Sequence, residues 1–338
     1  MDSVSQFVLG SAVTAATLGP RVPAARAVVW GGLLATLPDL DILIDHGDAI
    51  QNMTRHRAES HALFWMTLLA PLPAAGIAAL HRERHLFRRW WLAVWIAWIT
   101  HALLDALTIY GTQLWLPFDD RPVALGSLFV VDPLYTLPLL VGTVALVVGR
   151  GHPRSRRWNT AGLVLSTAYA ACTLLAQQHV RGVAARSLRE AGVAAEHVVV
   201  SPAPFQALVW RVVAVAGDRG YEGYRSLLDD TDTMRFEPFD RGSGLLAALA
   251  DDPSVERLRW FSGGMVKATR RGVDVLVTDL RMGAEPDYVF TFVVASADAN
   301  GRFESVARPG RLPFRADAAR GLAWLWRRIW DAGAERPR

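Results

Sequence analysis

Long apolar runs fill the first half of the chain, and this pattern ends near residue 178. Four runs approach the roughly 20 residues that a helix needs to cross a bilayer: 27–44, 62–80, 90–109 and 158–178. A fifth run, 134–148, is shorter but uncharged, and 7–18 predicts only a short, partly inserted or re-entrant helix. We therefore expect a polytopic α-helical membrane domain over residues 1–178, with about five spans after the short N-terminal helix.

Residues 179–338 show a different pattern, in which charged residues separate short apolar segments. Segments with β-branched or alternating apolar residues predict strands at 198–200, 207–215, 274–280 and 288–295. Helical spacing of apolar residues predicts amphipathic helices at 183–196 and 316–332, and 260–264 favours a strand followed by a turn. These elements predict a small extramembrane α+β domain.

Composition narrows the class of protein further. Hydrophobic residues make up 51% of the 338 residues and charged residues only 20%, which excludes a disordered chain. The single cysteine, Cys172, excludes a disulfide framework and a cysteine-ligated zinc site. The net charge of +4 is spread over both halves without a basic stripe, so we expect no nucleic-acid partner.

The arginines of the first half predict its orientation in the membrane. Ten of the 13 arginines before residue 179 fall in three connections, at 21–26, 82–89 and 150–157. Because positively charged connections stay in the cytoplasm, these three connections are expected inside and the alternate ones outside. The same rule predicts residues 179–338 on the outer side.

Ionisable residues gather where the outer ends of three predicted spans should lie. An ionisable group inside a membrane costs at least a few kcal/mol, so it usually marks a functional site or a paired contact. His101 and Asp105 are one helical turn apart and therefore share a helix face. The predicted metal ligands at this common depth are Asp39, Asp41, His56, His61, His101 and Asp105.

The mixture of imidazole and carboxylate ligands suits one or two divalent transition-metal ions, zinc or manganese above all. Such an ion lowers the pKa of bound water and supplies hydroxide near neutral pH. Glu59 is then expected to accept a proton, and Arg57 to hold a phosphate oxygen with two hydrogen bonds.

Simpler interpretations stay open for each part of this pattern. Asp39 and Asp41 would also suit a helix end at the membrane interface, and His101 with Asp105 a structural hydrogen bond. At the level of the whole protein, the alternatives are a regulatory or scaffold protein with a structural metal and an ion-coupled transporter. The transporter would need a second row of polar groups toward the cytoplasmic ends of the spans, which are nearly bare there.

The order of these motifs resembles the YdjM-like inner-membrane proteins of bacteria, a family of membrane-bound metal-dependent hydrolases. The matching motifs are Leu-Pro-Asp-Leu-Asp at 37–41, His-Arg-Ala-Glu-Ser-His at 56–61, His-Ala-Leu-Leu-Asp at 101–105 with Thr108 and Gly111, and Trp-Leu-Pro at 115–117. Residues 151–338 are similar to the extension of a longer subgroup.

The chain departs from the family's pattern at Ala58, where Gly is usual, and at Gln6, where many members have His. The resemblance implies a multi-pass protein of the bacterial inner membrane with hydrolase chemistry. A lipid or envelope precursor with an ester or phosphoester bond is the substrate class that we expect.

Overall fold

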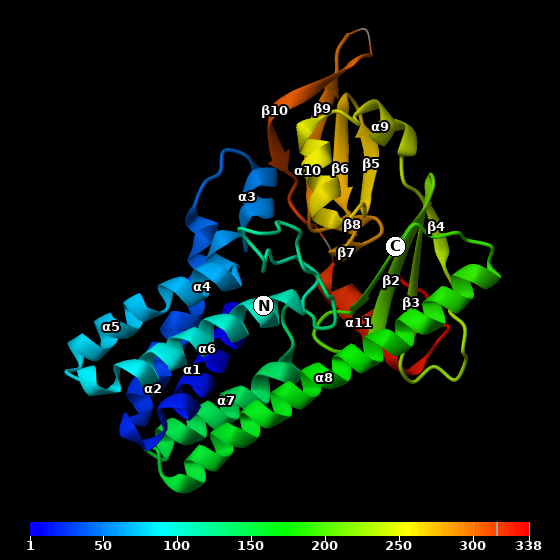
Figure 1. The fold of residues 1–338 in the computed structure, drawn as a ribbon. Helices are drawn as coiled ribbons and strands as arrows, with labels where there is room; N and C mark the ends of the chain where they lie inside the picture. The colour runs from blue at the N-terminus through cyan, green and yellow to red at the C-terminus, as the bar shows by residue number, and fades with distance from the viewer. Residues whose placement is uncertain (300, 316, 338) are drawn as a thin grey trace. The chain divides into compact units, whose positions relative to one another are not determined.

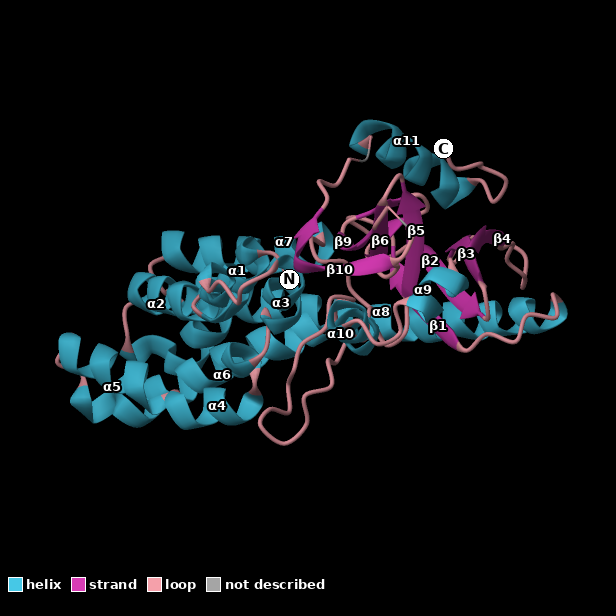
Figure 2. Ribbon diagram, turned by 90° about the horizontal axis from the view of Figure 1, so that it is seen from above, coloured by secondary structure: helices cyan, strands magenta, loops and turns pink. Residues whose placement is uncertain are grey.

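Helices dominate the first 190 residues of the chain, and the remainder combines antiparallel strands with shorter helices and loops (Figures 1 and 2). The structure is a computed structural model, and it describes residues 1–299, 301–315 and 317–337. It divides into two units. The helical unit comprises Met1–Leu43 and His56–Leu174, and the sheet unit comprises Ile44–Arg55 and Leu175–Arg338.

The helices of the helical unit follow the predicted apolar runs. They are α1 Ser3–Leu18, α2 Ala24–Thr36, α4 Leu63–Leu69, α5 Pro71–Leu80, α6 Phe87–Ala106, α7 Pro133–Val148 and the first part of α8 Pro153–Glu190. Short 3-10 segments join them: η1 Gly19–Arg21, η2 Pro38–Leu43, η3 Glu59–His61 and η4 Arg84–Leu86. Helix α2 ends at Thr36, and its C-cap Leu37 still has helical angles before η2 begins at Pro38, which has no backbone N–H to continue the α-helical bonds.

Two helical stretches among the described residues are long and apolar enough to cross a membrane. They are Leu63–Leu80, which joins α4 and α5, and the 38-residue helix α8, while α2 and α7 are apolar but shorter. The helical character of this region is therefore confirmed. Its crossing of the membrane in about five spans stays a prediction.

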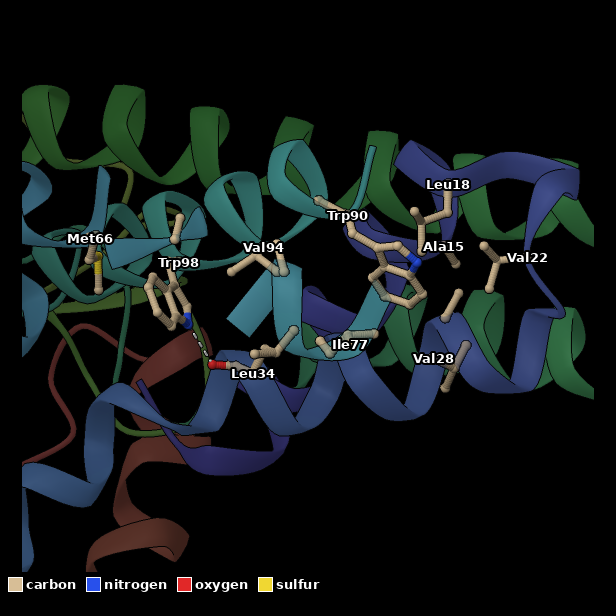
Figure 3. Packing of buried hydrophobic residues seen from close by; sticks show 14 of the residues in the cluster. Ala15, Leu18, Val22, Val28, Leu34, Met66, Ile77, Trp90, Val94 and Trp98 are labelled. Atoms are coloured by element: carbon tan, nitrogen blue, oxygen red, sulfur yellow. Dashed lines mark hydrogen bonds between the residues drawn. The ribbon is translucent and has the colours of Figure 1, made fainter. Parts of the chain in front are cut away.

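Helix α1 lies at the centre of the helical unit, packed against α2, α6 and α7. Asp2 caps its first turn by accepting hydrogen bonds from the backbone amides of Val4 and Ser5. Most of its residues are buried, so the segment expected to be partly inserted is a core helix of this unit. The adjacent core is built around Trp90 and Trp98, and the Trp98 indole donates a 2.9 Å hydrogen bond to the Leu34 carbonyl (Figure 3).

The contact between α1 and α2 depends on glycine. A Cβ atom on Gly31 would lie 2.5 Å from the Gly10 carbonyl oxygen and 2.6 Å from the Thr14 Cβ. Small residues at such a crossing let two backbones approach closely, which is how helices associate inside membranes. This close approach helps to fix the end of α2, from which the segment η2 continues.

Replacing Gly31 with alanine is expected to lower the melting temperature of the detergent-solubilised protein, because overpacking a tight contact costs about 1–3 kcal/mol. Gly76 in α5 is the matched control, since a Cβ atom there would meet nothing within 4 Å. The Gly76→Ala variant should melt at or above the wild-type temperature, because alanine favours a helix over glycine. Equal melting temperatures for the two variants would contradict the tight crossing.

The sheet unit contains two four-stranded antiparallel sheets and a two-stranded hairpin. The first sheet has the order β1-β2-β3-β4, with strands His197–Pro202, Val209–Ala216, Arg219–Ser226 and Glu237–Asp240. The second has the order β10-β9-β6-β5, with strands Phe303–Arg311, Thr291–Ala297, Asp274–Asp279 and Val266–Arg271. The hairpin pairs β7 Gly283–Ala284 with β8 Asp287–Tyr288, and the helices are α3 Ala49–Arg55, α9 Ser243–Ala248, α10 Pro253–Ser262, α11 Ala318–Trp330 and the end of α8.

A buried ion pair joins the first sheet to the chain that follows β6. The Arg211 guanidinium lies 2.6 Å from a Glu222 oxygen and donates a 2.9 Å hydrogen bond to the Leu280 carbonyl. Burial of the phenol raises the pKa of both Tyr224 and Tyr288 beside this pair. Both charged side chains are buried, so the ion pair contributes to the packing of the sheet unit.

One sequence-based expectation for the second half was right only in part, and another was wrong. The helix predicted at 183–196 is the end of α8, which continues unbroken through residue 178 because no proline interrupts it after Pro153. The stretch 260–264 is the end of α10, where Gly263 adopts the left-handed conformation that closes a helix. All four predicted strands overlap observed ones, and 316–332 contains α11, so an α+β fold is confirmed for this half.

Candidate metal centre

Three segments that lie far apart in the sequence bring acidic and imidazole side chains together. Asp39 lies in η2, directly after α2, and His61 ends η3, directly before α4. His101 and Asp105 lie one turn apart in the last part of α6. Four side-chain atoms, one from each residue, lie within 4.8 Å of one another.

The printed distances define a small and compact cluster of donor atoms. The His61 and His101 Nε2 atoms are 3.0 Å apart, and each lies 3.3 Å from Asp105 Oδ2. Asp39 Oδ1 completes the group at 3.3 Å from His61 Nε2 and 3.6 Å from His101 Nε2.

These separations fit a tetrahedral metal ion. Zinc binds histidine nitrogen and carboxylate oxygen at about 2.0–2.2 Å, so ligand atoms at the corners of its tetrahedron are about 3.3–3.6 Å apart. Five of the six edges run from 3.0 to 3.6 Å, and the sixth, between Asp39 and Asp105, is at most 4.8 Å. The cluster is therefore of the size that one divalent ion needs.

Unpaired polar atoms also point to a cation. Within the described part of the chain, Asp105 Oδ2 is buried and accepts no hydrogen bond of good geometry. A buried carboxylate oxygen without a partner is costly, and a metal ion would satisfy it. Burial disfavours the charged imidazole of His61, but the carboxylates of Asp105 and Asp39 outweigh it and raise its pKa.

Asp41 and His56 lie beside this cluster and contact each other. Asp41 accepts hydrogen bonds of 2.6 Å from both His56 Nδ1 and the Ser60 hydroxyl, and one of 3.0 Å from the Arg57 amide. Ser60 Oγ lies 2.8 Å from Nδ1 of His61, the nitrogen opposite the cluster. Asp41 and Ser60 therefore orient the His61 ring, whose Nε2 atom is a predicted metal ligand. Metal ligation by Asp41 and His56 themselves stays a prediction.

Arg57 is buried in the left-handed conformation, with φ of 66°, and its guanidinium contacts α6. Nη2 lies 3.1 Å from Asp105 Oδ1, and Nη1 donates a 3.2 Å hydrogen bond to the Thr108 hydroxyl. The Met1 ammonium contacts the same Asp105 oxygen. Since Oδ1 is held in this way, Oδ2 is turned toward the two histidines.

Two other residues near the cluster differ in their placement. Glu59 opens η3 with an exposed side chain and is not one of the four grouped residues. Gln6 is buried in α1 and donates a 3.3 Å hydrogen bond to the His101 carbonyl.

The supporting roles of Ser60 and Thr108 were missed at the level of sequence. Their only signal was a hydroxyl inside each of the two histidine motifs.

Fold and site together define an α-helical protein with a buried centre of two histidines and two aspartates, followed by an antiparallel sheet unit. The model of the YdjM inner membrane protein family matches residues 1–180, and the chain belongs to this family. The resemblance inferred from the motifs is thereby confirmed.

Curated relatives agree with this family. The chain is 25% identical over 315 residues to the uncharacterized protein YfhP of Bacillus subtilis. This match covers 87% of this chain and 90% of that protein. The chain is 33% identical over 133 residues to the inner membrane protein YbcI of Escherichia coli, which covers 36% of this chain and 73% of that protein. No solved structure matches the chain. Neither relative's name states a reaction.

Proposed function

We propose that this protein is a membrane-embedded metal-dependent hydrolase. The observation that carries the proposal is the convergence of His61, His101 and Asp105, whose donor atoms lie 3.0–3.3 Å apart, with the partly exposed Asp39 beside them. Zinc and manganese are the ions that we propose, because the ligands are imidazole and carboxylate without thiolate.

The four side chains are not equally accessible. His61, His101 and Asp105 have no exposed side-chain surface, whereas the Asp39 side chain is 20% exposed. Two histidines and one carboxylate are the ligand set of several catalytic zinc sites, which keep their fourth position for water. When bound, the metal would lower the pKa of that water to near neutrality.

The chain's own residues then have separate tasks. Asp39, on the accessible side, accepts the proton of the attacking water. Ser60 and Asp41 orient the His61 ring, and Arg57 holds the far oxygen of Asp105. This assignment moves Arg57 from the predicted phosphate contact to a positioning role, and it favours Asp39 over the exposed Glu59 as the base.

We propose a lipid or an envelope precursor with an ester or phosphoester bond as the substrate. Membership of an inner-membrane family and the two apolar helical stretches support a substrate that is itself found in the membrane. The arginine distribution further supports a multi-pass arrangement with the sheet unit on the outer side of the inner membrane.

One observation favours a second candidate, a membrane-anchored regulatory or scaffold protein with a structural metal. Four protein donors can close the coordination sphere of a tetrahedral ion and leave no position for water. The two candidates differ in what Asp39 does: it is a fourth permanent ligand in one and a base in the other.

A hydrolysis screen tests the proposed function. The full chain is purified in detergent, loaded with zinc or manganese, and incubated with inner-membrane phospholipids, lipid-linked envelope precursors and chromogenic phosphodiesters and acyl esters. We expect release of product from at least one class, loss of this release with a chelator, and recovery when the metal is restored. Metal-loaded protein that cleaves none of these classes would favour the scaffold.

A further inference from the structure

Helix α11 of the sheet unit has three distinct faces. Successive residues are about 100° apart around a helix, which places Leu322, Trp326 and Trp330 in one stripe along α11. Their side chains are 44%, 66% and 67% exposed. Ala319 and Ala323 fall in the same arc and are exposed as well, so this whole face is apolar and uncovered.

The opposite face of α11 packs against the first sheet, so the helix cannot rotate to bury its exposed stripe. Trp324, Leu325 and Ile329 are buried in one cluster with Val209 of β2 and with Ala203, which follows β1. Arg328 lies 2.7 Å from an Asp229 oxygen, and the Trp324 indole donates a 3.0 Å hydrogen bond to the Ala334 carbonyl. The exposed tryptophans are therefore held outward by the fold.

Two tryptophans exposed to this degree on one helix are unusual on the surface of a soluble protein. Their rings contact each other at 6.4 Å between centroids, which forms a single aromatic patch. Exposed patches of this kind mark binding surfaces, and tryptophan is enriched where proteins meet the interfacial region of membranes.

The arginines of α11 and the link between the sheet unit and helix α8 indicate which surface covers this aromatic patch. Helical periodicity places Arg320 and Arg327 beside each other at one edge of the apolar arc; both are exposed, and Arg320 lies 3.7 Å from an Asp317 oxygen. Arginines at such an edge are expected for a helix that lies on anionic lipid. Helix α8 contains one of the two apolar stretches long enough to cross a membrane, and its residues from Leu175 onward belong to the sheet unit. The sheet unit is thus tethered to a helix that would enter the bilayer.

We propose that the outer face of α11 docks on the surface of a bilayer that contains anionic phospholipid. Leu322, Trp326 and Trp330 enter the boundary between headgroups and acyl chains, and Arg320 and Arg327 contact lipid phosphates. This contact holds the sheet unit against the membrane from which its own chain emerges, independently of any reaction at the metal centre.

Fluorescence quenching by lipids tests the docking in the full chain. The protein carries Cys172→Ser and Ala323→Cys, so that an environment-sensitive dye sits inside the apolar arc while both tryptophans remain. It is placed in nanodiscs of phosphatidylglycerol and phosphatidylcholine with nitroxide-labelled lipids. We expect several-fold stronger quenching of this dye than of a dye at Asp218→Cys, an exposed position in the turn between β2 and β3.

Two sets of variants separate the contributions. Trp326→Ala with Trp330→Ala should remove the excess quenching, and Arg320→Gln with Arg327→Gln should remove its dependence on phosphatidylglycerol. Quenching at Ala323→Cys no stronger than at Asp218→Cys would overturn the proposal. A dye emission that shifts only when two copies share a nanodisc would also overturn it, because it assigns the face to a second copy of this chain.

Discussion

Replacement of His101 with alanine is expected to reduce the metal content of the purified protein to background and to abolish the proposed hydrolytic activity. The His101 Nε2 atom lies within 3.6 Å of the donor atoms of His61, Asp105 and Asp39, so its removal opens one corner of the tetrahedron. Even residues that only orient a ligand contribute 10–100-fold to metal affinity, and loss of a ligand should cost at least about 100-fold. Elemental analysis of protein purified in detergent measures the effect directly.

His85→Ala is the matched control, because His85 is an exposed histidine in η4, outside the four grouped residues. This variant should retain wild-type metal content. A cooperative melting transition of His101→Ala in the presence of a chelator, compared with that of chelated wild type, separates loss of metal from loss of fold. Wild-type metal content in a folded His101→Ala protein would contradict the centre.

The sequence was sufficient to predict the helices of the helical unit because apolar runs are a local property. The same runs could not show how α1 is used, since a stretch too short to span a membrane can equally pack inside a helical unit. Gly31 carries this information only through its contact with Gly10, and that contact exists only after α1 and α2 have met. The length of α8 was also missed, because its surface changes from apolar to mixed polarity without any break in the backbone.

The metal centre could be predicted as a set but not in its internal order. Asp39 and Asp41 are two residues apart in one motif, and His56 and His61 belong to another, so residue type cannot separate a ligand from its support. The structure places the two aspartates on different sides of the His61 ring. Asp39 faces the His61 Nε2 atom, whereas Asp41 lies 3.6 Å from Nδ1 on the other side of the ring.

Replacement of Asp39 with asparagine distinguishes a catalytic centre from a structural one. Asparagine keeps the shape of the side chain and a carbonyl oxygen but cannot accept a proton from water. If Asp39 is the base, we expect metal content close to wild type and a loss of kcat of about 10²–10⁴-fold on the substrate found in the screen. Asp120→Asn, an exposed position outside the centre, provides the same chemical change as a control and should leave both quantities unchanged.

The opposite result has an equally clear meaning. A fourth permanent ligand that loses its charge should release the metal, so Asp39→Asn would then resemble His101→Ala in elemental analysis. Of the four grouped side chains only Asp39 has exposed surface, so only this position can be open to water or a substrate in one case and closed in the other. The metal content and the kcat of this one variant therefore decide between a hydrolase and a membrane-anchored scaffold.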